Sequence, residues 1–235
     1  DYFVVTSLRV TAREQVVLFG GFDVDWRGDT WTWNGSGWTL AAEVGPPGRQ
    51  HHAMAYDVAR QKIVMYGGFS NQQGRLHDTW EWDGASWTRQ ATVGPPGHEY
   101  AAMAYDGARG KIVLLGGSDG ASAFGDTWEW DGSAWTQLPT PANGPAARQW
   151  HAMVADEHRD RVVMFGGFSW TDDQRGMQDT WEWDGTGWTQ TATAGPSARW
   201  WHSMAYDTSN KTVVLYAGYA DGTPTTDTWV YGFGK

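Results

Sequence analysis

The 235-residue sequence contains no cysteine, so disulfide bonds, thiolate metal sites and cysteine nucleophiles are all excluded. Basic residues are also few: 17 Lys and Arg stand against 27 Asp and Glu, which gives a formal net charge of −10. Such an acidic chain disfavours nucleic acid and anionic membranes as partners, because both need a basic face. No apolar run approaches the roughly 18 residues of a membrane-spanning helix. These absences do not fix the cellular compartment, since secreted proteins can also lack disulfides.

What the sequence has in abundance is a repeat built on Asp-Thr-Trp. The five copies begin at Asp29, Asp78, Asp126, Asp179 and Asp227. A short apolar segment ending in a glycine pair precedes each copy. These pairs are Gly20-Gly21, Gly67-Gly68, Gly116-Gly117 and Gly166-Gly167, with Ala217-Gly218 in the fifth copy. The spacing between copies is typical of propeller blades, whose repeats are about 40–50 residues long.

The second copy shows the order of the predicted strands, which we call A to D within each repeat. They are expected at residues 52–56, 62–66, 79–82 and from 87 onward. Strand B is an apolar, β-branched run that stops at the glycine pair, as in a strand buried on both faces. Alternation in strand C places Trp80 and Trp82 on one face, and Asp83-Gly84 is a hairpin signal before strand D. A blade this small cannot bury its own faces, so blades should stack around an axis, with the glycine pair allowing close backbone approach.

The glycine pair, a long loop, Asp-Thr-Trp-x-Trp and a third Trp, with Pro-x-x-Arg-x-x-His before strand A, resemble the Kelch repeat of the bacterial, galactose-oxidase-like kind. The resemblance covers essentially the whole chain. It implies an all-β fold, a five-bladed antiparallel β-propeller in a single domain spanning residues 1–235. The blades are expected at about 1–45, 46–94, 95–143, 144–195 and 196–235. Kelch propellers serve as binding platforms, partner adaptors and occasionally enzymes, so the resemblance alone does not fix the function.

The two ends of the chain leave the last blade open to two interpretations. The first copy starts directly with residues 2–10 as strand A, and the last ends soon after its strand C at 228–231, without a Trp-Thr strand D. Either the fifth blade has three strands, or residues 1–5 supply its outer edge. The first segment is short for both an outer and an inner strand, so we expect three strands. An exposed edge there could pair with another chain, and the oligomeric state stays open.

Aromatic residues that depart from the repeat are the main functional candidates. Thirteen of the 18 tryptophans follow the repeat. The other five are Trp26, Trp150, Trp170, Trp200 and Trp201. All five lie in B–C loops or in the linkers entering strand A, two segments that emerge on the same side of an up-and-down blade, and Tyr100 lies in the same zone. Such rings suit a carbohydrate or another small flat ligand, although they could also simply cover the channel rim.

Polar side chains beside these aromatics would give a ligand direction and specificity. The candidates are His51, Glu99, Arg49, Arg148 and Arg199. His51 is specific to its blade, because the same position holds Val4, Tyr100, Trp150 and Trp201 in the other blades. The three arginines align with one another. They are expected either to pair with the repeat aspartates in a structural network or to bind a ligand carboxylate.

A second aligned set consists of His52, His151 and His202 at one position of strand A. Three imidazoles around a narrow channel could hold a divalent metal, which is the one cofactor that the sequence suggests. Since Pro-x-x-Arg-x-x-His is itself close to the repeat pattern, hydrogen bonds to a neighbouring blade are the structural alternative.

Catalysis is not expected from the motifs. The copper-radical site of galactose oxidase needs a cysteine, and the Glu-x-x-x-Asp-x-x-x-His iron pattern of Kelch nitrile-specifier proteins is absent. Glycoside hydrolysis would need two carboxylates at a fixed separation. The loop acids available for it are Glu99, Asp23, Asp25, Asp119, Asp172, Asp173 and Asp221. We therefore expect a non-catalytic binding module for a carbohydrate or small flat molecule, with a protein-interaction platform or a glycoside hydrolase as alternatives.

Overall fold

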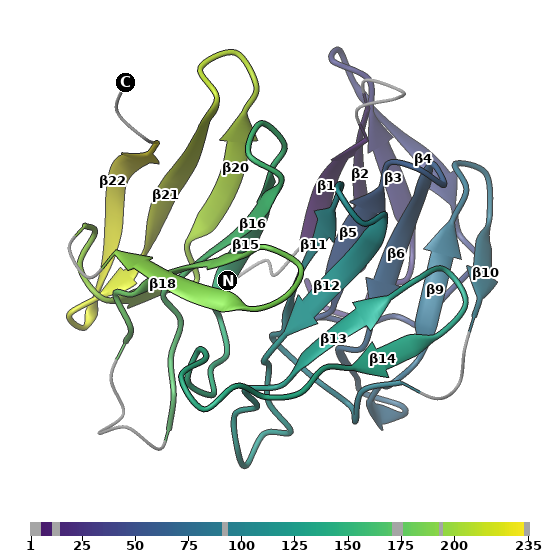
Figure 1. Cartoon of the computed structure of the whole chain (residues 1–235). Helices are drawn as coiled ribbons and strands as arrows, with labels where there is room; N and C mark the ends of the chain where they lie inside the picture. Colours follow the sequence, from purple (N-terminus) through teal and green to yellow (C-terminus); the bar gives the residue numbers. More distant parts are fainter. Residues whose placement is uncertain (1–5, 11–14, 91–93, 171–175, 193–194, 233–235) are drawn as a thin grey trace.

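A computed structural model describes residues 6–10, 15–90, 94–170, 176–192 and 195–232. These ranges contain strands and turns, and no helix suited to crossing a membrane occurs in them. Five antiparallel sheets follow one another along the chain and are arranged as the blades of a propeller (Figure 1). The all-β, five-bladed prediction is therefore confirmed.

The first four blades each contain strands A to D in chain order. Blade 1 is made of β1 (Thr6–Val10), β2 (Gln15–Phe19), β3 (Thr30–Trp33) and β4 (Trp38–Ala42). Blade 2 is made of β5 (Ala53–Asp57), β6 (Lys62–Tyr66), β9 (Thr79–Trp82) and β10 (Trp87–Arg89). Its B–C loop holds the small hairpin of β7 (Phe69–Ser70) and β8 (Gly74–Arg75). Blade 3 is made of β11 (Ala102–Asp106), β12 (Lys111–Leu115), β13 (Thr127–Trp130) and β14 (Trp135–Gln137). Blade 4 is made of β15 (Ala152–Asp156), β16 (Arg161–Phe165), β17 (Thr180–Trp183) and β18 (Trp188–Ala192).

Blade 5 differs from the others at its outer edge. It is made of β20 (Ser203–Asp207), β21 (Thr212–Ala220) and β22 (Thr223–Tyr231), and the short β19 (Arg199–Trp200) pairs with the distal part of β21. Within the described residues no strand pairs with the outer edge of β22, as expected for a blade with three strands of the repeat. The alternative edge at residues 1–5 lies outside the described ranges. In blade 2, strands B and C have the predicted bounds, while strand A begins and ends one residue later than predicted.

The core lies between the blades. Strand A of each blade contacts strand A of the next, which places these strands on the inside. Between blades 1 and 2, Phe19 packs against Trp87 with ring centroids 5.2 Å apart, and Trp87 Nε1 donates to Thr30 Oγ1 at 2.8 Å. Trp135 and Trp188 repeat this bond to Thr79 and Thr127 in the next two interfaces. The strand-D tryptophans of blades 2, 3 and 4 therefore join each of these blades to the one before it.

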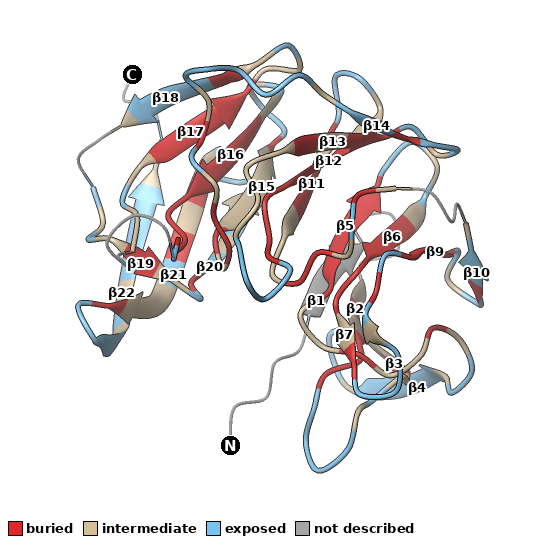
Figure 2. Ribbon diagram, turned by 90° about the horizontal axis from the view of Figure 1, so that it is seen from below, coloured by how far each residue is buried: buried red, intermediate tan, exposed pale blue. Residues whose placement is uncertain are grey.

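Blades 1 and 5, the first and last in chain order, each have an exposed face. Trp38 on blade 1 is 47% exposed, whereas Trp87 at the same position of blade 2 is 9% exposed. Tyr216 on blade 5 is 53% exposed, whereas Tyr66 at the same position of blade 2 is 1% exposed. Figure 2 shows the same contrast, because buried residues fill the middle blades while β4 and β22 are largely exposed.

Candidate functional site

The linker entering each blade runs beside the B–C loop of the preceding blade. The second glycine of each pair donates its N–H to a linker carbonyl. These bonds join Gly21 to Arg49 at 2.8 Å, Gly68 to His98 at 3.0 Å, Gly117 to Arg148 at 2.8 Å and Gly167 to Arg199 at 2.9 Å. Because the non-repeat aromatics lie in these two kinds of segment, the pairing brings several of them together.

The first glycine of each pair is required by this close approach. Gly67 has φ +69°, and a Cβ there would lie 2.6 Å from the carbonyl oxygen of His98. Gly166 has φ +63°, with the Arg199 carbonyl oxygen equally close. Ala217 takes the same conformation in blade 5, with φ +60°. Its methyl group therefore occupies the space that the next linker fills in the preceding blades.

The residue two positions before strand A has a left-handed backbone in four successive blades. His51, Tyr100, Trp150 and Trp201 have φ values between +56° and +61°. A chain of backbone hydrogen bonds connects them: Tyr100 N donates to His51 O at 3.0 Å, Trp150 N to Tyr100 O at 3.2 Å, and Trp201 N to Trp150 O at 3.1 Å. The main chain thus sets the spacing of these four side chains from blade to blade.

The rings at these positions join others from the loops to form one surface, which we call the aromatic face. It comprises Tyr100, Trp150, Phe168, Trp170, Trp200, Trp201 and Tyr219. Trp150 is its centre, with ring centroids 4.9 Å from Trp201, 5.4 Å from Phe168 and 6.1 Å from Trp170. Trp170 and Trp201 are 45% and 58% exposed, so their rings are accessible to a ligand.

A polar group borders the aromatic face at blades 2 and 3. The buried carboxylate of Glu99 forms an ion pair with Arg75, with Oε1 2.7 Å from Nε, and its other oxygen lies 3.5 Å from His51 Nδ1. The ring of His51 lies 4.0 Å from that of Tyr100, between centroids. Burial, and then the charge of Glu99, raises the pKa of Tyr100 to about 12, so its hydroxyl keeps its proton at neutral pH. Arg75 was missed from the sequence because it lies in a variable loop with no repeat signal.

Gln149 is the residue before Trp150 and is 2% exposed. Its backbone pairs with Phe168, and its Nε2 has no hydrogen-bond partner among the described residues. Buried amide donors are normally satisfied, so this atom suits a ligand acceptor or an ordered water.

The three predicted arginines are buried and hold the linkers in place. Arg49 is fully buried and binds Asp78 through two bonds, Nη1–Oδ1 at 2.6 Å and Nη2–Oδ2 at 2.9 Å. Arg148 binds Asp179 in the same way, and Arg199 binds Asp227. Burial alone would raise the pKa of Asp78, but the hydrogen bonds and charge of Arg49 hold it below its usual value. These guanidinium groups position the linkers that carry the aromatic rings.

The aligned histidines are buried separately, each against the preceding blade. His52 packs edge-on against Phe19, and His202 against Phe165. Burial, with the charge of Arg148 next, lowers the pKa of His151 to about 3, while the backbone of Leu115 opposes this shift. Burial likewise lowers the pKa values of His52 and His202 to about 3. Among the described residues there is no group of three or more His, Asp or Glu side chains arranged to hold a metal.

Two further sets of candidates make no ring contact with the aromatic face among the described residues. Trp26 forms its own small group with Phe22 and Phe69, at centroid distances of 5.4 and 5.5 Å. Among the loop acids, Asp23 pairs with Arg27 at 2.5 Å, and Asp119 accepts from the backbone of its own turn. Asp172 and Asp173 lie outside the described residues.

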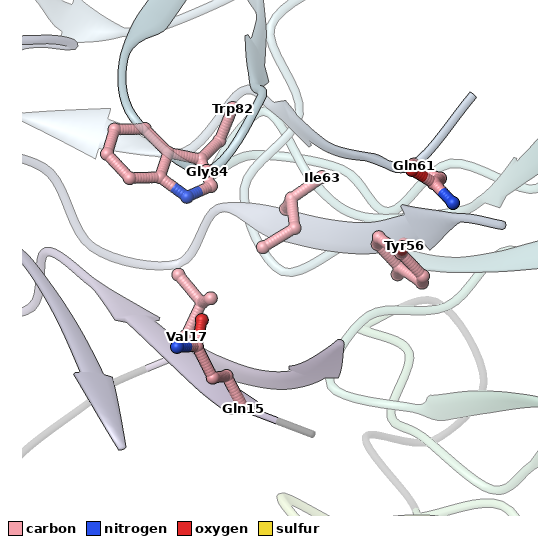
Figure 3. Close-up of a pocket in the computed structure, with 7 residues that line it drawn as sticks. All are labelled: Gln15, Val17, Tyr56, Gln61, Ile63, Trp82 and Gly84. Carbon is pink, nitrogen blue, oxygen red and sulfur yellow. The ribbon is translucent and has the colours of Figure 1, made fainter. Parts of the chain in front are cut away.

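A narrow cavity of about 10 Å³ opens between blades 1 and 2. Its lining residues are Gln15, Val17, Tyr56, Gln61, Ile63, Trp82 and Gly84 (Figure 3). Gln61 and Gly84 belong to the A–B and C–D turns, on the side away from the linkers and B–C loops. The cavity has room for about one water molecule and is separate from the aromatic face.

Comparison with known proteins agrees with the repeat geometry. The family model of the KLHDC2/KLHL20/DRC7 Kelch-repeats domain matches residues 6–189, from β1 into β18. A search of curated proteins found no match. The match spans most of the chain. It covers blades that contain the glycine pair, the Asp-Thr-Trp strand and the Arg–Asp pair of the linker. The chain belongs to the Kelch-repeat family of β-propellers.

Proposed function

We propose that this Kelch propeller is a non-catalytic binding module that holds its ligand on the aromatic face. The observation that carries the proposal is the left-handed backbone of His51, Tyr100, Trp150 and Trp201. This conformation costs a residue other than glycine roughly 1–2 kcal/mol, so glycine would be favoured at each position. Four large rings are present there instead, and backbone strain of this kind gathers at ligand sites.

The ligand that suits the aromatic face is a carbohydrate or another small molecule with a flat apolar side. The accessible rings of Trp170 and Trp201 offer stacking surfaces. Gln149 Nε2, in the residue before Trp150, and the Glu99 group, beside His51 and Tyr100, provide polar partners. Stacking supplies the affinity in this proposal, and the polar groups supply orientation.

A fluorescence titration tests this function. The wild type, a Trp170→Ala/Trp201→Ala variant and a Trp38→Ala control are titrated with cellohexaose, maltohexaose and chitohexaose. Each ring contributes about 0.5–1.5 kcal/mol, so the double variant should lose roughly tenfold or more in affinity. Trp38 is similarly exposed but lies on blade 1, so its removal should leave binding unchanged. Equal binding by the double variant and the wild type would contradict the proposal, provided that melting curves show both folded.

A protein partner on the same face is the second candidate. Kelch domains commonly mediate protein interactions, and accessible tryptophans such as Trp170 and Trp201 are typical anchors of protein interfaces. A photocrosslinking amino acid at position 201 would capture such a partner, with the same amino acid at position 38 as the control. Crosslinking at 201 only, together with silent saccharide titrations, would favour the protein partner.

A further inference from the structure

Neighbouring blades meet through two different faces. The face toward the following blade, which we call the acceptor face, carries the last residue of strand B and the threonine of Asp-Thr-Trp, which are Phe19 and Thr30 on blade 1. The face toward the preceding blade, which we call the donor face, carries the strand-D tryptophan, which is Trp87 on blade 2. Trp87 packs against Phe19 and donates from Nε1 to Thr30 Oγ1 at 2.8 Å. This interface therefore joins one donor face to one acceptor face.

The same pair of faces recurs between blades 2 and 3 and between blades 3 and 4. Trp135 packs against Tyr66 at 5.2 Å between centroids and donates to Thr79 Oγ1 at 2.8 Å. Trp188 donates to Thr127 Oγ1 at 3.0 Å. The three donor tryptophans and the three accepting threonines are all buried. Such a contact combines a large apolar area with a directional hydrogen bond, so it stabilises the interface and sets its geometry.

Blade 1 has a donor face that is uncovered in the described structure. Its strand-D tryptophan is Trp38, which is 47% exposed, whereas Trp87 is 9% exposed. Leu18 on the same face is partly exposed, although its equivalent Met65 is fully buried. The ring that packs on the preceding blade elsewhere in the molecule is therefore accessible to another surface.

Blade 5 has an acceptor face that is likewise uncovered among the described residues. Tyr216 lies opposite Thr228 in the β21–β22 pair. Phe19 lies opposite Thr30 in the same way in the β2–β3 pair. Tyr216 is 53% exposed, and Thr228 is also exposed, whereas Thr30 is fully buried. The shared register keeps the ring and the hydroxyl of blade 5 in the relation that accepts a tryptophan in blade 1.

Val230 makes the acceptor face of blade 5 more apolar than those of blades 2 to 4. It takes the place of Glu81, which in blade 2 pairs with Arg60 and Lys62. This position lies against the strand-C tryptophan of the following blade, as Glu81 Oε1 does at 3.3 Å from Trp130 Nε1. Val230 is 64% exposed. Exposed apolar side chains grouped in this way are typical of interaction sites, and an aromatic partner fits them.

The side chains that fit the acceptor face of blade 5 are those of the donor face of blade 1. Blades 1 and 5 lie at the two ends of an open arc, so they do not cover each other (Figure 2). Bringing them together within one chain would require rotation at the internal interfaces, which are closely packed. A Cβ on Gly45 would lie 2.7 Å from Trp87 Cδ1, and one on Gly94 would lie 2.8 Å from Trp135 Cδ1. A second copy can cover both faces without such a movement.

Ala217 limits what can cover the acceptor face of blade 5. In blades 1 to 4, a Cβ on the first glycine of the pair would lie between 2.5 and 2.7 Å from a carbonyl oxygen of the linker that enters the next blade. Blade 5 has a methyl group at this point, on a backbone of the same conformation. A linker in the position of the other four would clash with it. A blade of a separate molecule is not attached through a linker in that position.

We propose that blade 1 of one copy of this chain docks on blade 5 of a second copy. Trp38 of one copy packs against Tyr216 of the other and donates from Nε1 to its Thr228 Oγ1, in the arrangement that Trp135 has on blade 2. Two different faces take part, so the contact is heterologous and each copy can engage two neighbours. A ligand on the aromatic face is not required for this contact.

Sedimentation velocity of the full chain over a wide range of concentrations tests the contact. Trp38→Ala removes the donor ring, Tyr216→Arg places a charge on the acceptor face, and Thr228→Val removes the hydrogen-bond acceptor. Trp201→Ala is the matched control, because Trp201 is 58% exposed but belongs to the aromatic face. Thermal melting establishes that each variant is folded.

The wild type and Trp201→Ala should self-associate equally as the concentration rises. Trp38→Ala and Tyr216→Arg should each remain monomeric alone. An equimolar mixture of these two should form a dimer with one copy of each, because one intact donor face then meets one intact acceptor face. Thr228→Val should weaken the association roughly fivefold, as expected for one hydrogen bond. In the photocrosslinking experiment, position 38 should capture copies of this chain and no other protein.

A wild type that stays monomeric at every concentration would overturn the proposal. Self-association that survives Trp38→Ala or Tyr216→Arg would overturn it as well, since both faces are needed for every contact. A mixture of these two variants that stays monomeric would do the same, because a contact between two different faces must be restored by mixing.

Discussion

At the scale of single residues, Ala217 is the clearest departure from the repeat. The equivalent residue in each of the other four blades is a glycine with positive φ, and Ala217 keeps that conformation at φ +60°. Its backbone therefore carries a cost of roughly 1–2 kcal/mol that glycine would not. The alanine is tolerated because no following linker contacts it in the described structure.

Ala217→Gly should stabilise the protein by about 1 kcal/mol, since relief of the left-handed strain exceeds the added flexibility of the unfolded chain. Urea unfolding monitored by tryptophan fluorescence measures the change. Ala205→Gly on β20, a strand position without positive φ, is the control and should destabilise. A fall in stability for Ala217→Gly would contradict the strain argument.

At the scale of the elements, an Arg–Asp pair links the linker entering blades 2, 4 and 5 to the aspartate that precedes or belongs to strand C of the same blade. Blade 3 is a natural comparison, because His98 replaces the arginine and stacks on Phe124 at 4.2 Å, between centroids. Asp126 there accepts from Trp128 Nε1, and its Oδ1 has no hydrogen-bond partner among the described residues. In blade 2, both carboxylate oxygens of the repeat aspartate Asp78 accept hydrogen bonds. In blade 3, only one oxygen of Asp126 does so among the described residues.

Asp78→Ala should therefore destabilise the protein far more than Asp126→Ala. Both changes remove a bond to a tryptophan, which is worth about 1 kcal/mol. Only Asp78→Ala leaves a buried arginine without its partner, a loss of about 3–5 kcal/mol. The two free energies of unfolding, measured in urea, should differ by at least about 2 kcal/mol. Equal losses would show that the Arg49–Asp78 pair does not stabilise the linker.

The strands and the candidate site also show which features of this protein could be predicted from its sequence. Strands B and C of blade 2 were predicted to the residue, because a β-branched run stopped by glycine and an alternating Trp-x-Trp segment are local signals. The candidates Tyr100, Trp150, Trp170, Trp200 and Trp201 do come together. The left-handed backbone at His51 and its equivalents could not be predicted from the sequence, since glycine, and not His, Tyr or Trp, is the residue typical of this conformation. The contact of Arg75 with Glu99 joins a loop to a linker of another blade and leaves no pattern.

At the scale of the whole molecule, three buried histidines link successive blades. The pKa values of His52, His151 and His202 are about 3 in the folded protein, with burial as the main cause. In the unfolded chain a histidine has a pKa near 6.5. Below that pH the unfolded state binds more protons than the folded state, so stability falls as pH decreases.

The free energy of unfolding should be constant above about pH 7 and decrease between about pH 6 and 4. Each histidine contributes about 1.4 kcal/mol per pH unit in the steep part of this range. Urea midpoints across the range measure the slope. His151→Ala copies Ala101, the residue of blade 3 at this position, and should remove about a third of the slope. A flat profile from pH 7 to 4.5 would show that the three imidazoles are not buried in neutral form.

The backbone chain through His51, Tyr100, Trp150 and Trp201 has a consequence for engineering. Because main-chain bonds fix the distance between successive positions, exchanging the side chains should change what the surface recognises while keeping its spacing. Four such sites, one on each of four consecutive blades, form a natural set for a randomised display library. Variants selected from it would share one scaffold and differ only in the side chains presented to the target.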